Sequence, residues 1–168
     1  MNFLVRPLRS DEAGLYRDIR LEALRLHPEA FGASYENELA QPLAFFAGRL
    51  SGNVIFGGFR EQTLLGTAGF MIQAGAKRAH KGLLWGIYVN RAARGTGLAR
   101  QLVEAVLDHA REHVELIQLS VVASNMGARR LYSGMGFEPF GIEARSLKVD
   151  SCYFDEVLMV KLLGEQDS

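Results

Sequence analysis

The sequence predicts a single α/β domain, residues 1–168, with a mixed and mostly antiparallel central sheet of about seven strands flanked by about four helices. Three observations predict this class. Short apolar runs bounded by turn residues recur along the chain, as strands require. Four other segments carry apolar residues at helical spacing. In the second half, helical segments alternate with apolar runs, which is typical of strand–helix–strand units.

The first half of the chain predicts an edge strand, two helices and a hairpin. Pro7 lacks the N–H that a central strand would need, so the first strand belongs at an edge. The side chain of Ser10 can cap the first helix, and Pro28 ends it. The expected elements are a strand at 3–9, a helix at 10–27, a connector at 27–42, a short helix around 45–49 and two strands within 54–74.

The second half predicts a long helix between two buried strands, and a closing pair of strands. Apolar residues repeat along one side of the long helix and charged residues along the other, so it should cover one face of the sheet. The apolar positions are Leu98, Leu102, Val106 and Ala110. The expected elements are a loop at 73–82, strands at 83–89 and 116–122, the long helix to about 113, a helix within 125–135, and strands at 136–149 and 152–163.

Composition argues against several classes of protein. Hydrophobic residues make up 48% of the chain and charged residues 23%, as in ordinary globular domains. The formal net charge is zero, so general affinity for nucleic acid or for an anionic membrane is not expected. No apolar stretch reaches the roughly 18 residues that span a bilayer, and no signal-peptide pattern opens the chain. Cys152 is the only cysteine, which fits a reducing compartment, so we expect a cytoplasmic protein.

A glycine-containing turn follows the strand at 83–89 and leads, with almost no linker, into the long helix. The first N–H groups of a helix are unpaired, and their partial positive charge favours phosphate. Gly95 and Gly97 allow a tight turn and close approach of a ligand, while Arg94 and Arg100 could pair with phosphate oxygens. The alternative is an ordinary turn with solvated arginines. The dinucleotide and nucleoside triphosphate motifs are both absent from the sequence.

Two motifs carry a resemblance to a known family. Residues 94–99, RGTGLA, read as Arg-x-x-Gly-x-Ala, resemble the acetyl-coenzyme A pyrophosphate loop of the GNAT superfamily of N-acetyltransferases. Residues 125–137, NMGARRLYSGMGF, are similar to that superfamily's second signature, Asn-x-x-Ala-x-x-Leu-Tyr-x-x-x-Gly-Phe. The two occur in the family's order and spacing, and the likeness spans nearly the whole chain. One departure is Arg91, where many members have proline.

The resemblance implies a GNAT-like (acyl-CoA N-acyltransferase) fold and a reaction. Acetyl-CoA would be the co-substrate, with no metal, and its acetyl group would pass to a primary amine by direct attack on the thioester. Backbone groups of Ile87 and Val89 would pair with the pantetheine arm, and the Val89 amide would polarise the thioester carbonyl. The implied coenzyme-binding residues are Ile87, Val89, Arg94, Gly95, Thr96, Gly97, Leu98, Ala99, Asn125 and Tyr132. A homodimer is compatible with the resemblance.

Tyr132 is the expected catalytic residue. Its place in the second signature implies a general acid that protonates the departing thiolate, and a phenol with a pKa of roughly 10 stays neutral at working pH. By helical spacing alone, Tyr132 would be a core residue. Asn125 could contact the coenzyme, cap its own helix, or do both. Gly86 indicates a bulge that splays its strand from the parallel neighbour, with ordinary packing as the alternative.

The sequence indicates less about the binding site for the acceptor amine than about the binding site for the coenzyme. The connector at 27–42 and the loop at 73–82 should wall the acceptor pocket, because such loops carry specificity on a fixed scaffold. The acceptor could be a small molecule, an amino acid or a peptide N-terminus. The expected substrate-binding residues are Phe31, Tyr35, Glu36 and Glu38. The strand at 83–89 has no carboxylate to serve as general base, which leaves as candidates Glu36, Glu38, His80 and Asp155.

Two other functions fit parts of the sequence. His109, Glu112 and His113 match the His-x-x-Glu-His motif of a zinc metallopeptidase. These histidines lie in the last turn of a helix, where their charge suits the helix dipole, and no third ligand stands out. A module that binds coenzyme A or acyl-CoA without turnover would carry the same glycine turn. Tyr132 favours the enzyme over this module.

Overall fold

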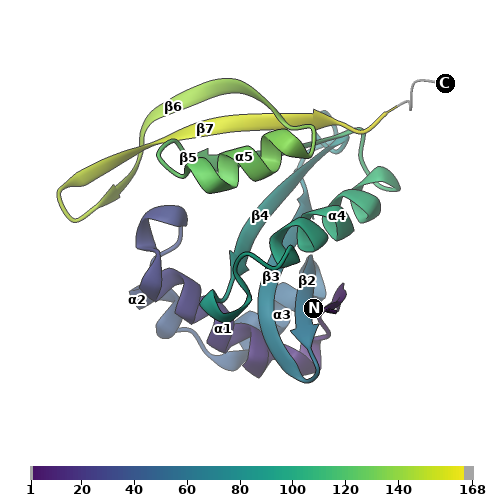
Figure 1. Cartoon of the computed structure of the whole chain (residues 1–168), viewed down its shortest axis with the longest axis vertical. Helices are drawn as coiled ribbons and strands as arrows, with labels where there is room; N and C mark the ends of the chain where they lie inside the picture. Colours follow the sequence, from purple (N-terminus) through teal and green to yellow (C-terminus); the bar gives the residue numbers. More distant parts are fainter. Residues whose placement is uncertain (1, 165–168) are drawn as a thin grey trace.

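Seven strands form one continuous sheet in the computed structural model of the protein, which describes residues 2–164 (Figure 1). The strand order is β1-β2-β3-β4-β5-β7-β6, and every neighbouring pair is antiparallel except β4 and β5. The strands are β1 (Leu4–Pro7), β2 (Val54–Arg60), β3 (Thr63–Ile72), β4 (Lys81–Val89), β5 (Leu116–Val122), β6 (Glu138–Val149) and β7 (Cys152–Leu162). The predicted fold class is confirmed, including the edge position of the strand with Pro7.

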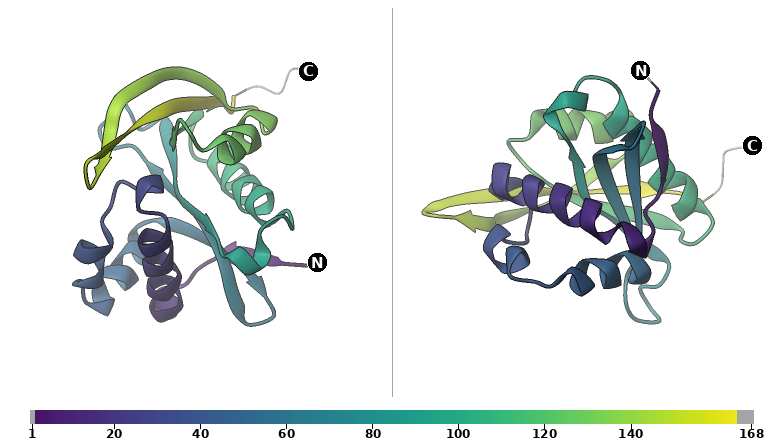
Figure 2. Two further views of the ribbon diagram at one scale, coloured as in Figure 1. Left: turned by 60° about the vertical axis from the view of Figure 1, so that its left-hand side comes forward. Right: turned by 90° about the horizontal axis from the view of Figure 1, so that it is seen from below.

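Within residues 2–164, five α-helices flank the sheet, with α1, α2 and α3 on one face and α4 and α5 on the other (Figure 2). They are α1 (Ala13–Leu26), α2 (Tyr35–Leu39), α3 (Leu43–Gly52), α4 (Leu98–Arg111) and α5 (Met126–Gly134). The additional helix, α2, lies in the segment expected to be a connector. None of the helices in residues 2–164 combines the length and the apolar character needed to cross a lipid bilayer.

The start of α1 differs from its prediction. Residues 10–12 form a 3-10 turn, and the α-helix begins at Ala13. The side chain of Ser10 makes no hydrogen bond with any described residue. Glu12 takes the expected role instead, because its carboxylate accepts a hydrogen bond from the Arg9 N–H at 2.9 Å and is held by Arg6 at 2.8 Å. A carboxylate is a stronger acceptor than a hydroxyl, so it stabilises this turn more.

Helix α4 covers the sheet through the apolar side that the sequence predicts. The four predicted side chains all have 0% exposure: Leu98, Leu102, Val106 and Ala110. Gly58 on β2 lets the helix approach closely, because a Cβ there would lie 2.5 Å from Leu98 Cδ1. This packing sets the position of the first turn of α4. That turn lies near the end of β4 that is not paired with β5.

Strands β4 and β5 pair at one end and separate at the other. Their register runs only from Lys81 opposite Leu116 to Leu83 opposite Gln118. The pairing of β4 with β3 shifts around Gly86, which has a φ of +62° that other residues rarely adopt. The expected bulge at Gly86 is therefore present. Beyond Leu83, the edge of β4 that faces β5 has no partner strand among the described residues.

Candidate functional site

A cavity of about 690 Å³ lies where β4 and β5 separate. Its walls come from the end of β4, the loop at 90–97, α5 with the turn before it, and the connector after α1. Seven of the ten predicted coenzyme-binding residues line it: Ile87, Val89, Arg94, Gly95, Ala99, Asn125 and Tyr132. Of the other three, Thr96 and Gly97 lie in the loop and Leu98 begins α4, and none of them lines the cavity. The structure thus brings the two sequence motifs together in one place.

The loop between β4 and α4 leaves the first turn of the helix without a side-chain cap. The loop spans residues 90–97 and contains a 3-10 turn, Arg91–Ala93, so the linker is longer than the sequence suggests. The Thr96 hydroxyl donates to the Ala93 carbonyl and closes the loop. Gly97 then occupies the position before the helix with a φ of +87°. No side chain accepts a hydrogen bond from the N–H groups of the first helical turn. Those groups are free to bind an anion.

Replacing Gly97 with alanine should lower the free energy of unfolding by about 1–2 kcal/mol. A Cβ strains a backbone with φ of +87°, although no atom lies within 4 Å of its expected position. Gly48→Ala is the matched control, because Gly48 lies inside α3 with equally open surroundings and an ordinary φ. That change should raise the free energy of unfolding by about 0.5–1 kcal/mol. Denaturant unfolding measures both, and two changes of the same sign would contradict the account of the loop.

Tyr132 lies on α5 at the gap between β4 and β5, with only 4% of its surface exposed. Its ring packs edge-on against Phe137, with the centroids 5.8 Å apart. Its hydroxyl makes no hydrogen bond to any described residue, and burial raises its pKa. The phenol therefore keeps its proton over the neutral range. Tyr132 is thus a core residue that also borders the cavity, and its role as general acid stays a prediction.

Asn125 has one of its two expected roles in the structure, and its contact with the coenzyme stays a prediction. The Ala128 N–H donates to the Asn125 side-chain oxygen at 3.2 Å, so the residue caps α5. It also lines the cavity.

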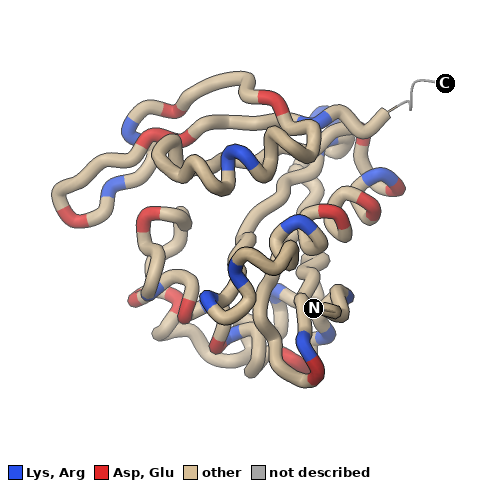
Figure 3. The backbone as a smooth tube through the Cα atoms, viewed as in Figure 1, with Lys and Arg blue, Asp and Glu red and all other residues tan. Residues whose placement is uncertain are grey.

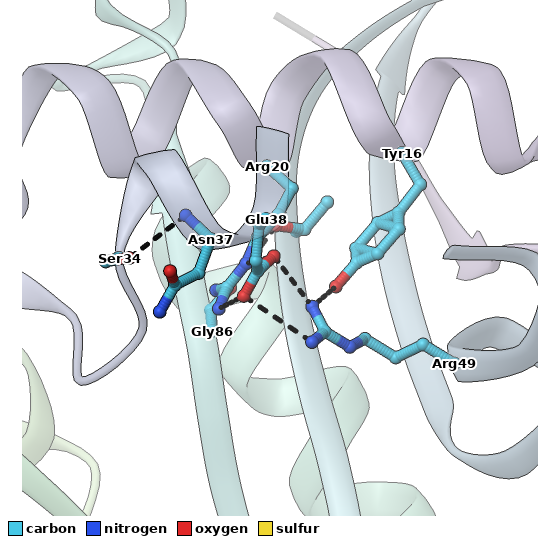
Figure 4. A network of polar contacts seen from close by, with 8 residues as sticks. Tyr16, Arg20, Ser34, Asn37, Glu38, Arg49 and Gly86 are labelled. Carbon is cyan, nitrogen blue, oxygen red and sulfur yellow. Dashed lines mark hydrogen bonds and ion pairs between the residues drawn. The ribbon is translucent and has the colours of Figure 1, made fainter. Parts of the chain in front are cut away.

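Glu38 lies in a buried ion-pair network on the α1 face of the sheet (Figure 4). Arg20 donates to both carboxylate oxygens at 3.0 Å, and Arg49 donates to one at 3.1 Å and to the Tyr16 hydroxyl at 3.3 Å. Burial alone would raise the pKa of Glu38, but hydrogen bonds and charge from the two arginines outweigh it and lower the pKa. Glu38 also lines neither large cavity in the described structure. It is therefore poorly suited to bind an amine or to act as the base.

The sequence does not indicate the partners of Glu38, because they come from different helices. Arg20 lies on α1 and Arg49 on α3, and neither belongs to a motif. Both guanidinium groups lie over the ring of Trp85, at 5.8 and 5.5 Å from its centroid. The network thus packs against β4 at Trp85, one residue before the bulge at Gly86.

A second cavity, of about 640 Å³, lies between the connector after α1 and the hairpin of β6 and β7. Phe31, Tyr35 and Glu36, three of the four residues expected to bind the acceptor, line it, and Phe31 also lines the first cavity. The prediction that the loop at 73–82 walls this pocket is wrong, because none of its residues lines either cavity. That loop precedes the paired end of β4, whereas the hairpin extends toward the connector after α1 (Figure 1).

The remaining base candidates differ in their positions. His80 lies beside the paired end of β4, where its carbonyl accepts from the Glu115 N–H at 2.8 Å, and it lines neither cavity. Asp155 accepts from the Arg145 N–H at 2.7 Å within the hairpin. Glu36 is the one of the four that lines a large cavity in the described structure.

His109 packs against aromatic side chains of the sheet, and the exposed His113 stacks on it. Their rings stack with centroids 4.2 Å apart, and His109 also packs edge-on against Phe56 and Phe70. Burial, and then the neighbouring His113, lower the pKa of His109. Residues 2–164 contain no group of three or more His, Cys, Asp or Glu side chains that could hold a metal ion. The packing accounts for both histidines.

Comparison with known proteins assigns the family. The model of the acetyltransferase (GNAT) family matches residues 16–137, which include both sequence motifs. The chain belongs to the acetyltransferase (GNAT) family.

Basic and acidic residues are interspersed over its described backbone, so the basic residues at the start of α4 are a local feature (Figure 3).

Two curated proteins are similar to this GNAT chain in sequence. N-alpha-acetyltransferase RimI of Mycobacterium tuberculosis is 32% identical over 117 residues, which are 70% of this chain and 66% of RimI. N-alpha-acetyltransferase 30 of Saccharomyces cerevisiae is 40% identical over 58 residues, 34% of this chain and 33% of that protein. The matches thus span just under two thirds and one third of these relatives.

Solved structures share the GNAT fold at lower identity. A GNAT acetyltransferase from Streptococcus pneumoniae superposes with a TM-score of 0.86 at 20% identity, covering 97% of this chain and 100% of that one. The putative acetyltransferase yncA of Salmonella typhimurium, solved with its cofactor acetyl-CoA, gives 0.81 at 20% identity and covers 100% and 98%. These matches extend the likeness to β6 and β7, which the family model leaves out.

Proposed function

We propose that this GNAT protein transfers the acetyl group of acetyl-CoA to a primary amine. One observation carries the proposal: the cavity at the separation of β4 and β5 brings together the loop at 94–99, an unpaired strand edge and Tyr132. The names of the two N-alpha-acetyltransferase relatives and the acetyl-CoA bound by yncA support it.

The donor fits the cavity through backbone groups. The N–H groups of Leu98 and Ala99 at the uncapped start of α4 would bind the diphosphate. A Cβ at Gly95 or Gly97 would meet no atom within 4 Å, so space for the phosphates is open beside the loop. The edge of β4 at Ile87 and Val89 would pair with the pantetheine arm as an added strand does. The thioester would then lie near the bulge, within reach of Tyr132.

The reaction needs a nucleophile, carbonyl polarisation and a proton donor. The amine nitrogen attacks the thioester carbonyl carbon, whose oxygen accepts a hydrogen bond from the Val89 N–H. The carbon–sulfur bond breaks, and Tyr132 gives its proton to the thiolate. The product nitrogen loses a proton to a base or to water, and the phenolate regains one from solvent.

The second cavity offers the amine an entrance. Phe31 lines both cavities and would separate the acceptor pocket from the donor site. Glu36 is exposed at this pocket and would take the amine proton, directly or through water. Among the possible acceptors, small molecules, amino acids and peptide N-termini, the names of the relatives favour the peptide N-terminus. The single cysteine supports a reducing setting such as the cytoplasm.

An acceptor screen tests the proposal. The purified protein is mixed with acetyl-CoA and with panels of short peptides, amino acids and polyamines, and the release of free thiol is followed. We expect release that depends on the acceptor and stops when the acceptor's amine is already acetylated. Tight binding of acetyl-CoA with no release for any acceptor would favour the alternative, a module that binds the coenzyme without turnover.

A further inference from the structure

A histidine at the end of α1 contacts an arginine of the loop at 94–99. His27 Nε2 lies 2.9 Å from Arg94 Nη2. A guanidinium group has only donors, so in this contact the Nε2 atom accepts and carries no proton. The Arg94 Nε also donates to the Val89 carbonyl at 3.3 Å. The guanidinium of Arg94 is therefore fixed at two points, one on the connector and one at the end of β4.

His27 is itself held in place. The backbone N–H of His27 donates to the Ala23 carbonyl at 3.0 Å. This is the last hydrogen bond of α1, and Pro28 follows directly. Its ring packs against Tyr88 on β4, with the centroids 5.9 Å apart. His27 and Arg94 both line the 690 Å³ cavity. The Nε2 atom of His27, which accepts the hydrogen bond, is therefore held in place beside Arg94, the one charged side chain of residues 94–99.

The two contacts use two of the five N–H groups of Arg94, one on Nε and one on Nη2, and three are left. The Nη1 group makes neither of these two contacts, and Arg94 also interacts with the Tyr88 hydroxyl. A long arginine side chain that is free in solution loses rotamer freedom when a ligand orders it. An arginine that the protein already holds avoids this loss.

We propose that His27 is a positioning residue for coenzyme binding: its neutral imidazole holds Arg94 in the conformation that receives the diphosphate. The proposal rests on the proposed function. Ordering one such side chain on binding costs roughly two- to tenfold in affinity. His27 therefore contributes to donor binding and not to the acetyl-transfer step.

Two substitutions of His27 separate positioning from packing. His27→Ala removes the acceptor, whereas His27→Gln supplies an amide oxygen that can accept from Arg94. Calorimetry measures the binding of coenzyme A and of dephospho-CoA, which keeps the diphosphate and lacks the 3′-phosphate. We expect His27→Ala to weaken both ligands by the same two- to tenfold, and His27→Gln to restore most of the affinity. In an active assay, KM for acetyl-CoA should follow these values while kcat stays unchanged.

His113→Gln is the matched control. His113 is exposed beyond the far end of α4, roughly 20 Å along the helix axis from the loop, and this change should leave both affinities unaltered. The proposal is overturned if His27→Ala binds coenzyme A as tightly as the wild type, or if His27→Gln binds no better than His27→Ala. A wild-type protein that binds no coenzyme A would instead overturn the proposed function, and this proposal with it.

Discussion

Replacing Tyr132 with phenylalanine should lower kcat by about 10²- to 10⁴-fold while KM for acetyl-CoA changes little. This range is what a positioned proton donor contributes. Phenylalanine keeps the ring that packs against Phe137 and removes only the hydroxyl, which makes no hydrogen bond to a described residue. The fold should therefore survive the change. Steady-state kinetics with a good acceptor measure both constants.

Tyr153→Phe controls for the loss of a tyrosine hydroxyl as such. Tyr153 is 51% exposed on β7 and lines neither large cavity in the described structure. Its substitution should leave kcat and KM unchanged. A Tyr132→Phe enzyme with wild-type turnover would remove the general-acid role from this residue and leave it a purely structural one.

Replacing Glu38 with alanine should lower the free energy of unfolding by about 3–5 kcal/mol. The change leaves two guanidinium groups without their carboxylate, and removing one partner of a buried ion pair has a cost of this size. The side chains of Arg20 and Arg49 are only 9% and 18% exposed, so water replaces little of the loss. Urea unfolding at neutral pH gives the value. Glu36→Ala, two residues away and exposed, should change it by less than about 0.5 kcal/mol.

The same network predicts a pH dependence of stability. The pKa of Glu38 is lowered in the folded protein, so its ion pairs stabilise the fold above the ordinary range of a glutamate, near 4.5. This stabilisation is lost as the pH falls through the lower folded pKa. Below pH 4.5 the wild type should therefore lose stability more steeply than Glu38→Gln, which has no carboxyl group to protonate. Equal slopes for the two proteins would show that folding does not lower the pKa of Glu38.

Local patterns were enough to predict the sheet and several of the residues that line the first cavity. The apolar period of α4 and the glycines of the loop at 94–99 act over a few residues, and the structure keeps both. Gly86 likewise predicted the bulge, because a glycine inside a strand indicates a backbone conformation that other residues rarely adopt. The placement of Tyr132 and Asn125 beside that loop followed from the two motifs and their order.

Contacts between distant segments could not be predicted in this way. His27 and Arg94 are 67 positions apart, and Glu38 meets arginines from two other helices. Strand β7 inserts between β5 and β6, and this arrangement brings the hairpin rather than the loop at 73–82 to the second cavity. Helix α2 has five residues, too few for a helical period to show. Its one local signal was Ser34, whose hydroxyl accepts from the Asn37 N–H.

A crystal structure of the protein with coenzyme A tests the central claim most directly. We expect diphosphate oxygens within about 2.7–3.2 Å of the Leu98 and Ala99 nitrogens and the pantetheine arm along β4 at Ile87 and Val89. The sulfur should then lie close to the Tyr132 hydroxyl. A coenzyme with its phosphates bound away from the start of α4 would contradict the account.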